Sequence, residues 1–243
     1  MNLSEIIPCQ QNHLQTLNNR LKFKQICTLC ASHQGGDLGI CTPCLNDLPW
    51  HDSPQCPQCA LHTDGRVCGS CLNSPPEFNA THALFTYDYP IDGLLQHYKY
   101  KETLHLANTF SALMVNKQLS NETHKRIDRI IPMPMHSTRL KERGFNQALE
   151  IARLVSKHLK IKLDYTTCQR TRYTPPQASL PLKERIKNIK GVFDCTQSLQ
   201  GLSIAVIDDV MTTGASLNEL AKTLKQAGAA HVECWIIART LPK

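Results

Sequence analysis

The chain has 243 residues, of which 27 are Lys or Arg and 20 are Asp or Glu, giving a net charge of +7. This length leaves room for one substantial hydrophobic core and a small additional module. No stretch approaches the roughly 18 apolar residues of a membrane-spanning helix, and no basic segment leads into an apolar one at the start. We therefore expect a cytoplasmic protein without a membrane span.

Charge is distributed unevenly along the sequence. Residues 1–75 hold four basic and five acidic side chains, whereas residues 139–190 hold thirteen basic and four acidic ones. A basic field of this kind suits pyrophosphate or nucleic acid as a ligand. The alternative is a solvated helix face, which explains the lysines of residues 157–162 better than the cluster at residues 139–143.

The N-terminal part contains most of the cysteines. We expect a helical lead-in over residues 1–26 and then four CxxC pairs. These pairs are Cys27/Cys30, Cys41/Cys44, Cys56/Cys59 and Cys68/Cys71. Twelve cysteines without an export signal favour metal over disulfides, and four thiolates from two consecutive pairs suit tetrahedral Zn²⁺. The spacing predicts a double zinc ribbon with two four-cysteine sites over residues 27–75. The alternative ligand is an iron–sulfur cluster.

A Pro-rich stretch at residues 73–78 marks the expected domain boundary, so that a second domain covers residues 78–243. Its apolar patterns predict strands at 83–87, 127–131, 162–167, 204–207 and 231–238, and helices at 91–98, 104–119, 145–159 and from 216 onward. This alternation predicts an α/β fold with a mostly parallel sheet flanked by helices. Cys168, Cys195 and Cys234 lie apart from the CxxC pairs, and we interpret them as isolated structural residues.

Two basic segments connect these elements. In the first, residues 135–143 are predicted to form a basic loop after the strand at 127–131, where an open α/β sheet commonly binds anions. In the second, residues 170–190 are basic and turn-rich, a composition typical of a mobile cover over an active site. A lysine between two predicted helices, Lys99, is either solvated or placed at a phosphate or sugar.

The most informative stretch is residues 204–216, IAVIDDVMTTGAS. It predicts a buried strand, an acid pair at Asp208 and Asp209, and a Thr-Thr-Gly loop whose N–H groups and hydroxyls meet an anion at a helix N-terminus. Ser216 and Glu219 have the spacing of a capping box. Adjacent carboxylates suit vicinal sugar hydroxyls or hydrated Mg²⁺. The alternative is an ordinary strand end whose acids cap a helix.

This stretch resembles the phosphoribosyl pyrophosphate (PRPP) motif of type I phosphoribosyltransferases. Together with the CxxC pairs, it makes residues 27–238 similar to the ComF competence protein family, also called ComFC or GntX-like. The segments that carry the likeness are CLNDLPW, IPMPMHSTRLKERGFNQA, RTRYTPPQASLPLKERIKNIKGVF and VIDDVMTTGAS. The resemblance implies an N-terminal zinc ribbon joined to a type I phosphoribosyltransferase-like domain.

The resemblance also implies residue roles. Asp208 and Asp209 would bind the ribose hydroxyls, with or without Mg²⁺, and carry any catalysis. The phosphate-binding residues would be Val210, Met211, Thr212, Thr213, Gly214, Ala215 and Ser216. The pyrophosphate loop would contribute Met135, His136, Arg139, Lys141 and Arg143. The flexible loop would contribute Thr171, Gln177, Arg185 and Asn188.

Two functions follow from the resemblance. As a binding module, the protein would handle incoming single-stranded DNA during natural transformation, at the cytoplasmic side of the uptake machinery and the inner face of the membrane. As an enzyme, it would transfer phosphoribosyl from PRPP to an acceptor, although no segment of the sequence marks a base-selecting hood. A third hypothesis, compatible with either, has the zinc ribbons dock a helicase or translocation protein.

Overall fold

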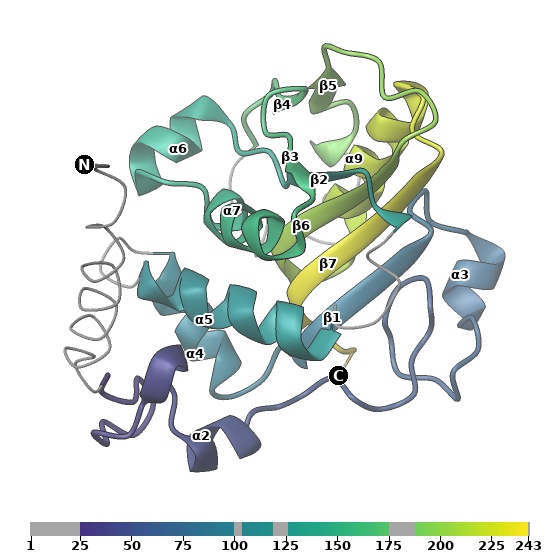
Figure 1. The fold of residues 1–243 in the computed structure, drawn as a ribbon. Coiled ribbons are helices and arrows are strands. Elements are labelled where there is room, and N and C mark those ends of the chain that lie inside the picture. Colours follow the sequence, from purple (N-terminus) through teal and green to yellow (C-terminus); the bar gives the residue numbers. More distant parts are fainter. Residues whose placement is uncertain (1–24, 100–103, 119–125, 175–187, 243) are drawn as a thin grey trace, which may run out of the picture. The chain divides into compact units, whose positions relative to one another are not determined.

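The structure is a computed structural model that describes residues 25–99, 104–118, 126–174 and 188–242 (Figure 1). By its internal contacts the chain separates into two compact units, one ending at Asn46 and the other beginning at Asp47. The described part of the first unit contains the 3-10 turn η1 (Gly36–Leu38) and the short helix α2 (Thr42–Asn46). Apart from residues 25 and 26, the predicted helical lead-in lies outside the described residues.

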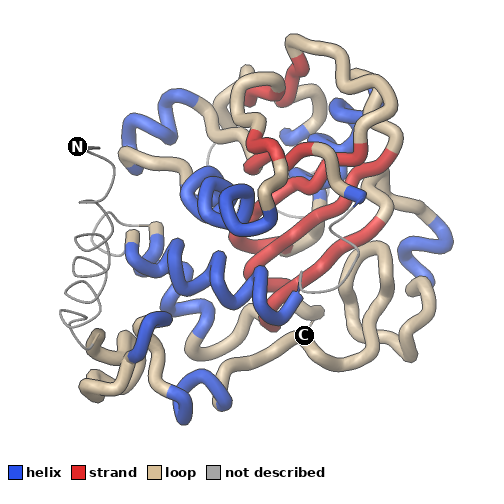
Figure 2. The backbone as a smooth tube through the Cα atoms, viewed as in Figure 1, coloured by secondary structure: helices blue, strands red, loops and turns tan. Residues whose placement is uncertain are grey.

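The second unit is built on a parallel five-stranded sheet in the order β1-β7-β6-β2-β3 (Figure 2). The strands are β1 (Ala80–Thr86), β2 (Arg129–Pro132), β3 (Lys162–Leu163), β6 (Ser203–Met211) and β7 (His231–Arg239). Helices α5 (His105–Leu113) and α7 (Gln147–Leu159) lie on one side of the sheet, and α9 (Ala215–Gln226) lies on the other (Figure 1). The predicted α/β fold with a parallel sheet flanked by helices is confirmed.

Burial of apolar side chains explains the central strands. Ile204–Ile207 of β6 are fully buried, and β7 is buried from Val232 to its end. Strands covered on both faces need such continuous apolar runs. In α9, Leu217, Leu220, Ala221 and Leu224 recur at helical spacing and face this core.

The helices before β2 were partly predicted. Helix α4 covers Ile91–Tyr98, as expected from the sequence. The helix expected at 104–119 is instead α5 followed by a π-helical turn, η3 (Met114–Gln118), within the described residues.

A small antiparallel sheet follows a strand that is shorter than predicted. The strand expected at 162–167 is limited to β3, and the chain then forms β4 (Cys168–Arg170), which pairs with β5 (Phe193–Cys195). Cys168 and Cys195 face each other in this pairing, with their Sγ atoms 3.0 Å apart. The interpretation of these two cysteines as isolated was therefore wrong, because the pairing that joins them is not local in sequence.

The predicted basic loop at 135–143 is also wrong in part, because residues Ser137–Arg143 form a helix, α6. The ring nitrogen Nδ1 of His136 accepts a hydrogen bond from the N–H of Thr138 at 3.2 Å, which caps the start of the helix. Gly144 ends it in the left-handed region, with φ of 80°. The helix shows no buried residue, so it has none of the apolar periodicity by which a helix is predicted.

The second cysteine group belongs to the unit that holds the sheet. Helix α3 (Gly69–Asn73) carries Cys71, and Cys56, Cys59 and Cys71 pack in one cluster with buried residues of the sheet and of α9. This unit therefore begins before the second cysteine group, whereas the sequence pattern predicts a boundary at residues 73–78. Across the described residues, no helix has both the length and the apolar character required to cross a bilayer.

Candidate functional site

A cavity of about 270 Å³ opens where β6 ends and α9 begins. Its walls are Arg139, Arg170, Thr174, Ile189, Asp208, Val210, Met211, Thr212, Thr213, Gly214, Ala215, Ser216 and Leu217. All seven residues predicted to bind phosphate are among them. The cavity lies at the carboxyl end of a parallel strand, which is where open α/β sheets bind ligands.

The loop from Thr212 to Gly214 delivers the chain into α9. Gly214 is the N-cap residue in the left-handed region, with φ of 78°, and its carbonyl accepts from the N–H of Asn218 at 2.8 Å. The N–H of Ala215 donates to Oγ1 of Thr213 at 3.3 Å. The first N–H groups of a helix have no partner within the helix, and here they lie at the cavity wall.

The predicted capping box is wrong. No side chain caps α9, and the carboxylate of Glu219 instead accepts from the N–H of Gly191 at 2.7 Å. A contact between segments far apart in sequence has therefore taken the acid that the local pattern assigned to the cap. Ser216 is left at the cavity wall, where its hydroxyl can meet a ligand.

The two acids of the pair, Asp208 and Asp209, have different surroundings. Asp208 lines the cavity, and Asp209 lies 3.9 Å from the ammonium of Lys99. Burial, together with the negative charge of Asp209, raises the pKa of Asp208 well above its usual range, and Lys99 opposes this shift. A cation or a hydroxyl donor at Asp208 would relieve the cost of this buried charge. Lys99 therefore lies beside the acid pair rather than in the cavity wall, and its predicted place at a phosphate or sugar stays a prediction.

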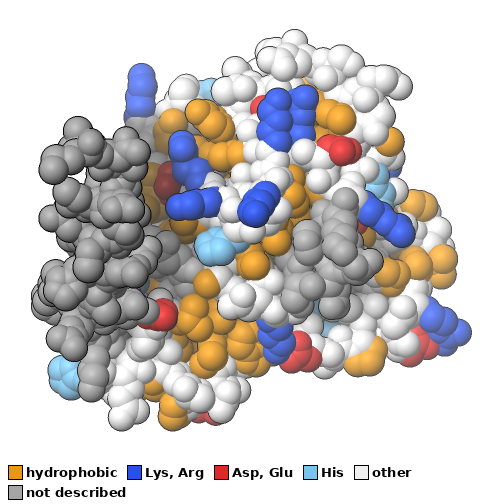
Figure 3. Space-filling view, in the orientation of Figure 1, with side chains coloured by type: hydrophobic (Ala, Val, Ile, Leu, Met, Phe, Trp, Pro, Cys, Tyr) orange, Lys and Arg blue, Asp and Glu red, His pale blue; other side chains and the backbone are white. Residues whose placement is uncertain are grey.

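Two guanidinium groups enter the cavity from other elements: Arg139 from α6 and Arg170 from the end of β4. Burial and the nearby positive charge of Arg139 lower the pKa of Arg170, whereas Asp208 raises it. Arg170 donates from Nη2 to the hydroxyl of Thr174, and its buried Nε has no partner among the described residues. Figure 3 shows several Lys and Arg side chains over α6 and α7 on the face turned toward the viewer. An anion in the cavity would satisfy the guanidinium groups of both Arg139 and Arg170.

Arg170, Thr174, Ile189 and Leu217 were not predicted as site residues. The only sequence signal for the first three was that the segment 170–190, which contains them, was interpreted as an active-site cover.

The other predicted loop residues that the structure describes do not line the cavity. His136 caps α6 and contacts the ring of Tyr173, with centroids 5.6 Å apart, and Arg143 donates to Oε1 of Gln147 at 3.2 Å. Lys141 is exposed and Met135 is half-buried.

Thr171 donates from its N–H and its hydroxyl to the carbonyl of Val192 at 2.9 and 3.3 Å. The carbonyl of Asn188 accepts from Arg172 at 3.0 Å. Gln177 and Arg185 lie outside the described residues.

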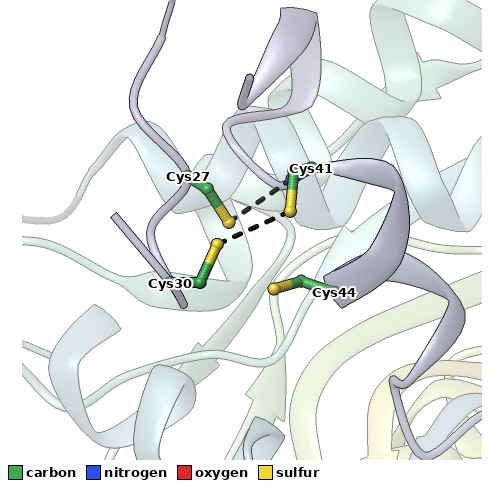
Figure 4. A group of neighbouring side chains, drawn as sticks. All are labelled: Cys27, Cys30, Cys41 and Cys44. Carbon is green, nitrogen blue, oxygen red and sulfur yellow. Dashed lines mark hydrogen bonds between the residues drawn. The ribbon is translucent and has the colours of Figure 1, made fainter. Parts of the chain in front are cut away.

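The first cysteine group brings together Cys27, Cys30, Cys41 and Cys44, whose sulfur atoms lie within 4.8 Å of one another (Figure 4). Sγ of Cys30 and Sγ of Cys41 are 3.6 Å apart, close to the about 3.8 Å edge of a tetrahedron with Zn–S bonds of about 2.3 Å. Burial raises the pKa of Cys27, but the N–H groups of Cys41, Cys30 and Leu29 outweigh burial and lower it to about 6. These observations fit a zinc ion bound by four thiolates.

The second group, Cys56, Cys59, Cys68 and Cys71, repeats this geometry within the sheet unit. Sγ of Cys59 and Sγ of Cys68 are 3.6 Å apart, and the N–H of Cys68 donates to Sγ of Cys56 at 3.4 Å. Burial raises the pKa of Cys56, but backbone N–H groups again outweigh it and lower the value to about 7. Both groups therefore have the donor set and the spacing of a structural zinc site.

Comparison with known proteins identifies relatives over most of the chain. No family model matches it. The DNA utilization protein YhgH of Escherichia coli K12 is 32% identical over 222 residues, which cover 89% of this chain and 97% of that protein. Competence protein F of Haemophilus influenzae is 29% identical, over 83% of this chain and 90% of its own. Competence protein ComFC of Streptococcus pneumoniae is 25% identical, over 93% and 97%.

Solved structures are more distant. The glutamine PRPP amidotransferase of Bacillus subtilis is 16% identical over 65% of this chain, which spans 32% of that chain, with a TM-score of 0.38. A purine phosphoribosyltransferase of Pyrococcus horikoshii is 15% identical over 65% of this chain and 87% of its own, with a TM-score of 0.29. The YhgH alignment passes 30% identity over nearly the whole length of that protein, and the competence proteins match over similar spans. The chain therefore belongs to the ComF competence protein family.

Proposed function

We propose that this protein handles single-stranded DNA during DNA uptake through a domain that binds PRPP. The observation that carries the PRPP part is one cavity that joins an acidic residue, a Thr-Thr-Gly loop at a helix N-terminus, and two guanidinium groups. The names of the relatives, DNA utilization protein and competence protein, support the DNA part. The same proposal places the protein at the cytoplasmic side of the uptake machinery, beside a helicase or translocation protein.

Each part of PRPP has a complementary feature in the cavity. The loop from Thr212 to Ser216 would hold the 5′-phosphate through N–H groups and hydroxyls. Asp208 would accept hydrogen bonds from the ribose hydroxyls, and Arg139 and Arg170 would bind the pyrophosphate as charge-assisted donors. Mg²⁺ would supply neutralising charge to the pyrophosphate, and the carboxylates of Asp208 and Asp209 are the oxygen donors that this ion prefers.

The alternative is an active phosphoribosyltransferase, favoured by the presence of two guanidinium groups in the same cavity as the acid. In that reaction the bond from ribose C1 to the pyrophosphate oxygen breaks, a bond from C1 to the acceptor forms, and pyrophosphate leaves with the electron pair. Arg139 and Arg170 would stabilise the departing charge. The acceptor is unidentified, so candidate acceptors would be screened once PRPP binding has been measured.

The first test is titration calorimetry of PRPP with Mg²⁺ into wild type and Asp208→Asn. We expect the variant to lose affinity by at least about tenfold, because it lacks the negative oxygen that the ribose and the ion would meet. The raised pKa of Asp208 means that its carboxyl gains charge as pH rises, so wild-type affinity should increase with pH.

Asp47→Asn is the matched control, because Asp47 is exposed and does not line the cavity. Equal PRPP affinity in wild type and Asp208→Asn would show that the ribose does not bind in this cavity. No PRPP binding by wild type, with DNA binding intact, would mean that the fold serves as a scaffold for nucleic acid.

The DNA part is tested by replacing Arg139, Lys141 and Arg143 of α6 with Ala. If single-stranded DNA crosses this helix, affinity should fall and the dependence of log K on log salt should flatten by about 0.7 for each phosphate that the protein no longer neutralises. Fluorescence anisotropy of a labelled oligonucleotide over a salt series measures both quantities. An unchanged slope would place the DNA path elsewhere.

Two comparisons make this test specific. Lys157→Ala/Lys162→Ala/Lys225→Ala removes the same charge from positions that do not line the cavity, and it should leave the slope closer to wild type. Lys141→Ala/Arg143→Ala keeps Arg139, which lines the cavity. It therefore separates weaker DNA binding from damage to the PRPP site.

A further inference from the structure

The side chain of Arg239, the last residue of β7, lies between the second cysteine group and the phosphate loop. Arg239 is only 4% exposed. Its Nε donates to the carbonyl of Cys59 at 2.8 Å. Its Nη1 donates to the carbonyl of Met211 at 3.0 Å and also to the carbonyl of Thr212. One guanidinium therefore bonds both to the backbone of a cysteine ligand and to the start of the loop.

The shape of the guanidinium suits this bridge. Arg presents five donors in a rigid planar fork, and it stays charged when it is buried among carbonyl oxygens. Lys has three donors on a single nitrogen, so it cannot bond at the same angles to carbonyls on opposite sides. Met211 and Thr212 are the residues at which β6 turns into the loop, so their orientation decides where the loop's N–H groups point.

The cysteine side of the bridge is fixed to the sheet. His51, which is buried, places Nε2 2.8 Å from the carbonyl of Ala60 and Nδ1 3.1 Å from Oγ1 of Thr86 in β1. The N–H of Thr81 donates to the carbonyl of Pro57 at 3.2 Å. The turn that carries Cys59 is therefore part of the sheet's framework, and a metal ion at the second group would hold its backbone in one conformation.

We propose that Arg239 is a positioning residue that couples the second cysteine group to the phosphate loop. Metal at this group orders the Cys59 carbonyl, which orients the guanidinium, which in turn sets the carbonyls of Met211 and Thr212. The consequence for ligand binding rests on the proposed function, whereas the coupling itself does not. Coupling is reciprocal, so a ligand in the loop should also stabilise metal at the second group.

The first test compares full-length wild type with Arg239→Lys and Arg66→Lys. Arg66 lies beside the second group but is exposed and pairs with Asp64, so its substitution is a matched control. We expect Arg239→Lys to retain two zinc ions per chain. Amide hydrogen exchange in peptides covering 208–216 should speed up, and affinity for ribose 5-phosphate should fall by about tenfold. Arg66→Lys should match wild type in all three measurements.

The second test uses chains with Arg239 unchanged, so it tests the coupling even if Arg239→Lys fails to fold. Zinc release to a coloured chelator is followed with and without saturating ribose 5-phosphate. The Cys44→Ser variant, which lacks a ligand of the first group, identifies the release phase of the second. We expect the ligand to slow that phase by several-fold and to leave the other phase unchanged.

The outcomes separate this proposal from the proposed function. The coupling would be overturned if amide exchange in residues 208–216 were equal in wild type and Arg239→Lys. It would also be overturned if a ligand that does bind left the rate of zinc release from the second group unchanged. Failure of wild type to bind ribose 5-phosphate or PRPP would overturn the proposed function. Hydrogen exchange would still test the coupling in that case.

Discussion

Replacing Cys71 with Ser is expected to destabilise the sheet unit by at least about 3 kcal/mol, because it removes one thiolate of a metal group that packs in the unit's own core. Cys56, Cys59 and Cys71 lie in the same buried cluster as Phe78, Met211 and Leu217. Loss of metal would leave the thiols of Cys56, Cys59 and Cys68 without their common partner, and the turns that carry them would lose the constraint that holds them.

Tryptophan fluorescence during denaturant unfolding measures this effect selectively. Both tryptophans of the chain, Trp50 and Trp235, belong to the sheet unit. Trp235 is fully buried, and Trp50 packs on Phe85 with ring centroids 4.7 Å apart. The control is Cys44→Ser in the other compact unit, which should leave the fluorescence transition near that of wild type. Equal, small shifts for both variants would show that the second group adds little to the core.

Sequence patterns were sufficient where structure is set locally. Strand β6 and helix α9 follow from an apolar run, a Thr-Thr-Gly loop and leucines at helical spacing. Helix α4 has the predicted bounds because its apolar residues, Ile91, Leu94, Leu95 and Tyr98, all face the core. The two cysteine groups were predictable because CxxC pairs place their own ligands.

The remaining features depend on contacts between distant segments. Arg170 reaches the cavity only because β4 pairs with β5, and each of these strands has three residues, too few for a period-2 pattern to be recognised. Glu219 had the spacing of a cap, but the N–H of Gly191 offered it a partner that no local pattern reveals. Helix α6 has no buried face, so only its His136 cap and its Gly144 stop mark it.

The two cysteine groups illustrate the same distinction at the level of domains. Their CxxC spacing is alike, and both were therefore assigned to one module. The structure places the second group in the sheet unit through His51 and Arg239, whose partners are backbone carbonyls and a threonine hydroxyl far away in sequence. Every residue has a backbone carbonyl, so the type of the accepting residue does not predict such a hydrogen bond. Such a bridge can be found only in three dimensions.

Gly214→Ala is expected to abolish measurable phosphate binding in the loop while the sheet unit stays folded. A Cβ at this position would lie 2.6 Å from Cε of Met211, which is itself buried, and the backbone φ of +78° disfavours any side chain. The left-handed conformation costs about 1–2 kcal/mol for a non-glycine residue, and overpacking adds about 1–3 kcal/mol. The backbone can escape the first cost only by leaving the left-handed conformation, and the buried end of the Met211 side chain must shift to relieve the second.

Gly201→Ala separates strain from the clash. Gly201 has a similar φ of +75°, but a Cβ there would meet nothing within 4 Å. Both variants should therefore lose stability to backbone strain, measured by denaturant unfolding, whereas only Gly214→Ala should lose ribose 5-phosphate and PRPP binding, measured by calorimetry. Because the backbone carbonyl of Met211 accepts from Arg239, any shift of the Met211 backbone should disturb the bridge to Cys59 as well. Binding of PRPP by Gly214→Ala with wild-type affinity would mean that the phosphate is held by other groups of the cavity, such as Arg139 and Arg170.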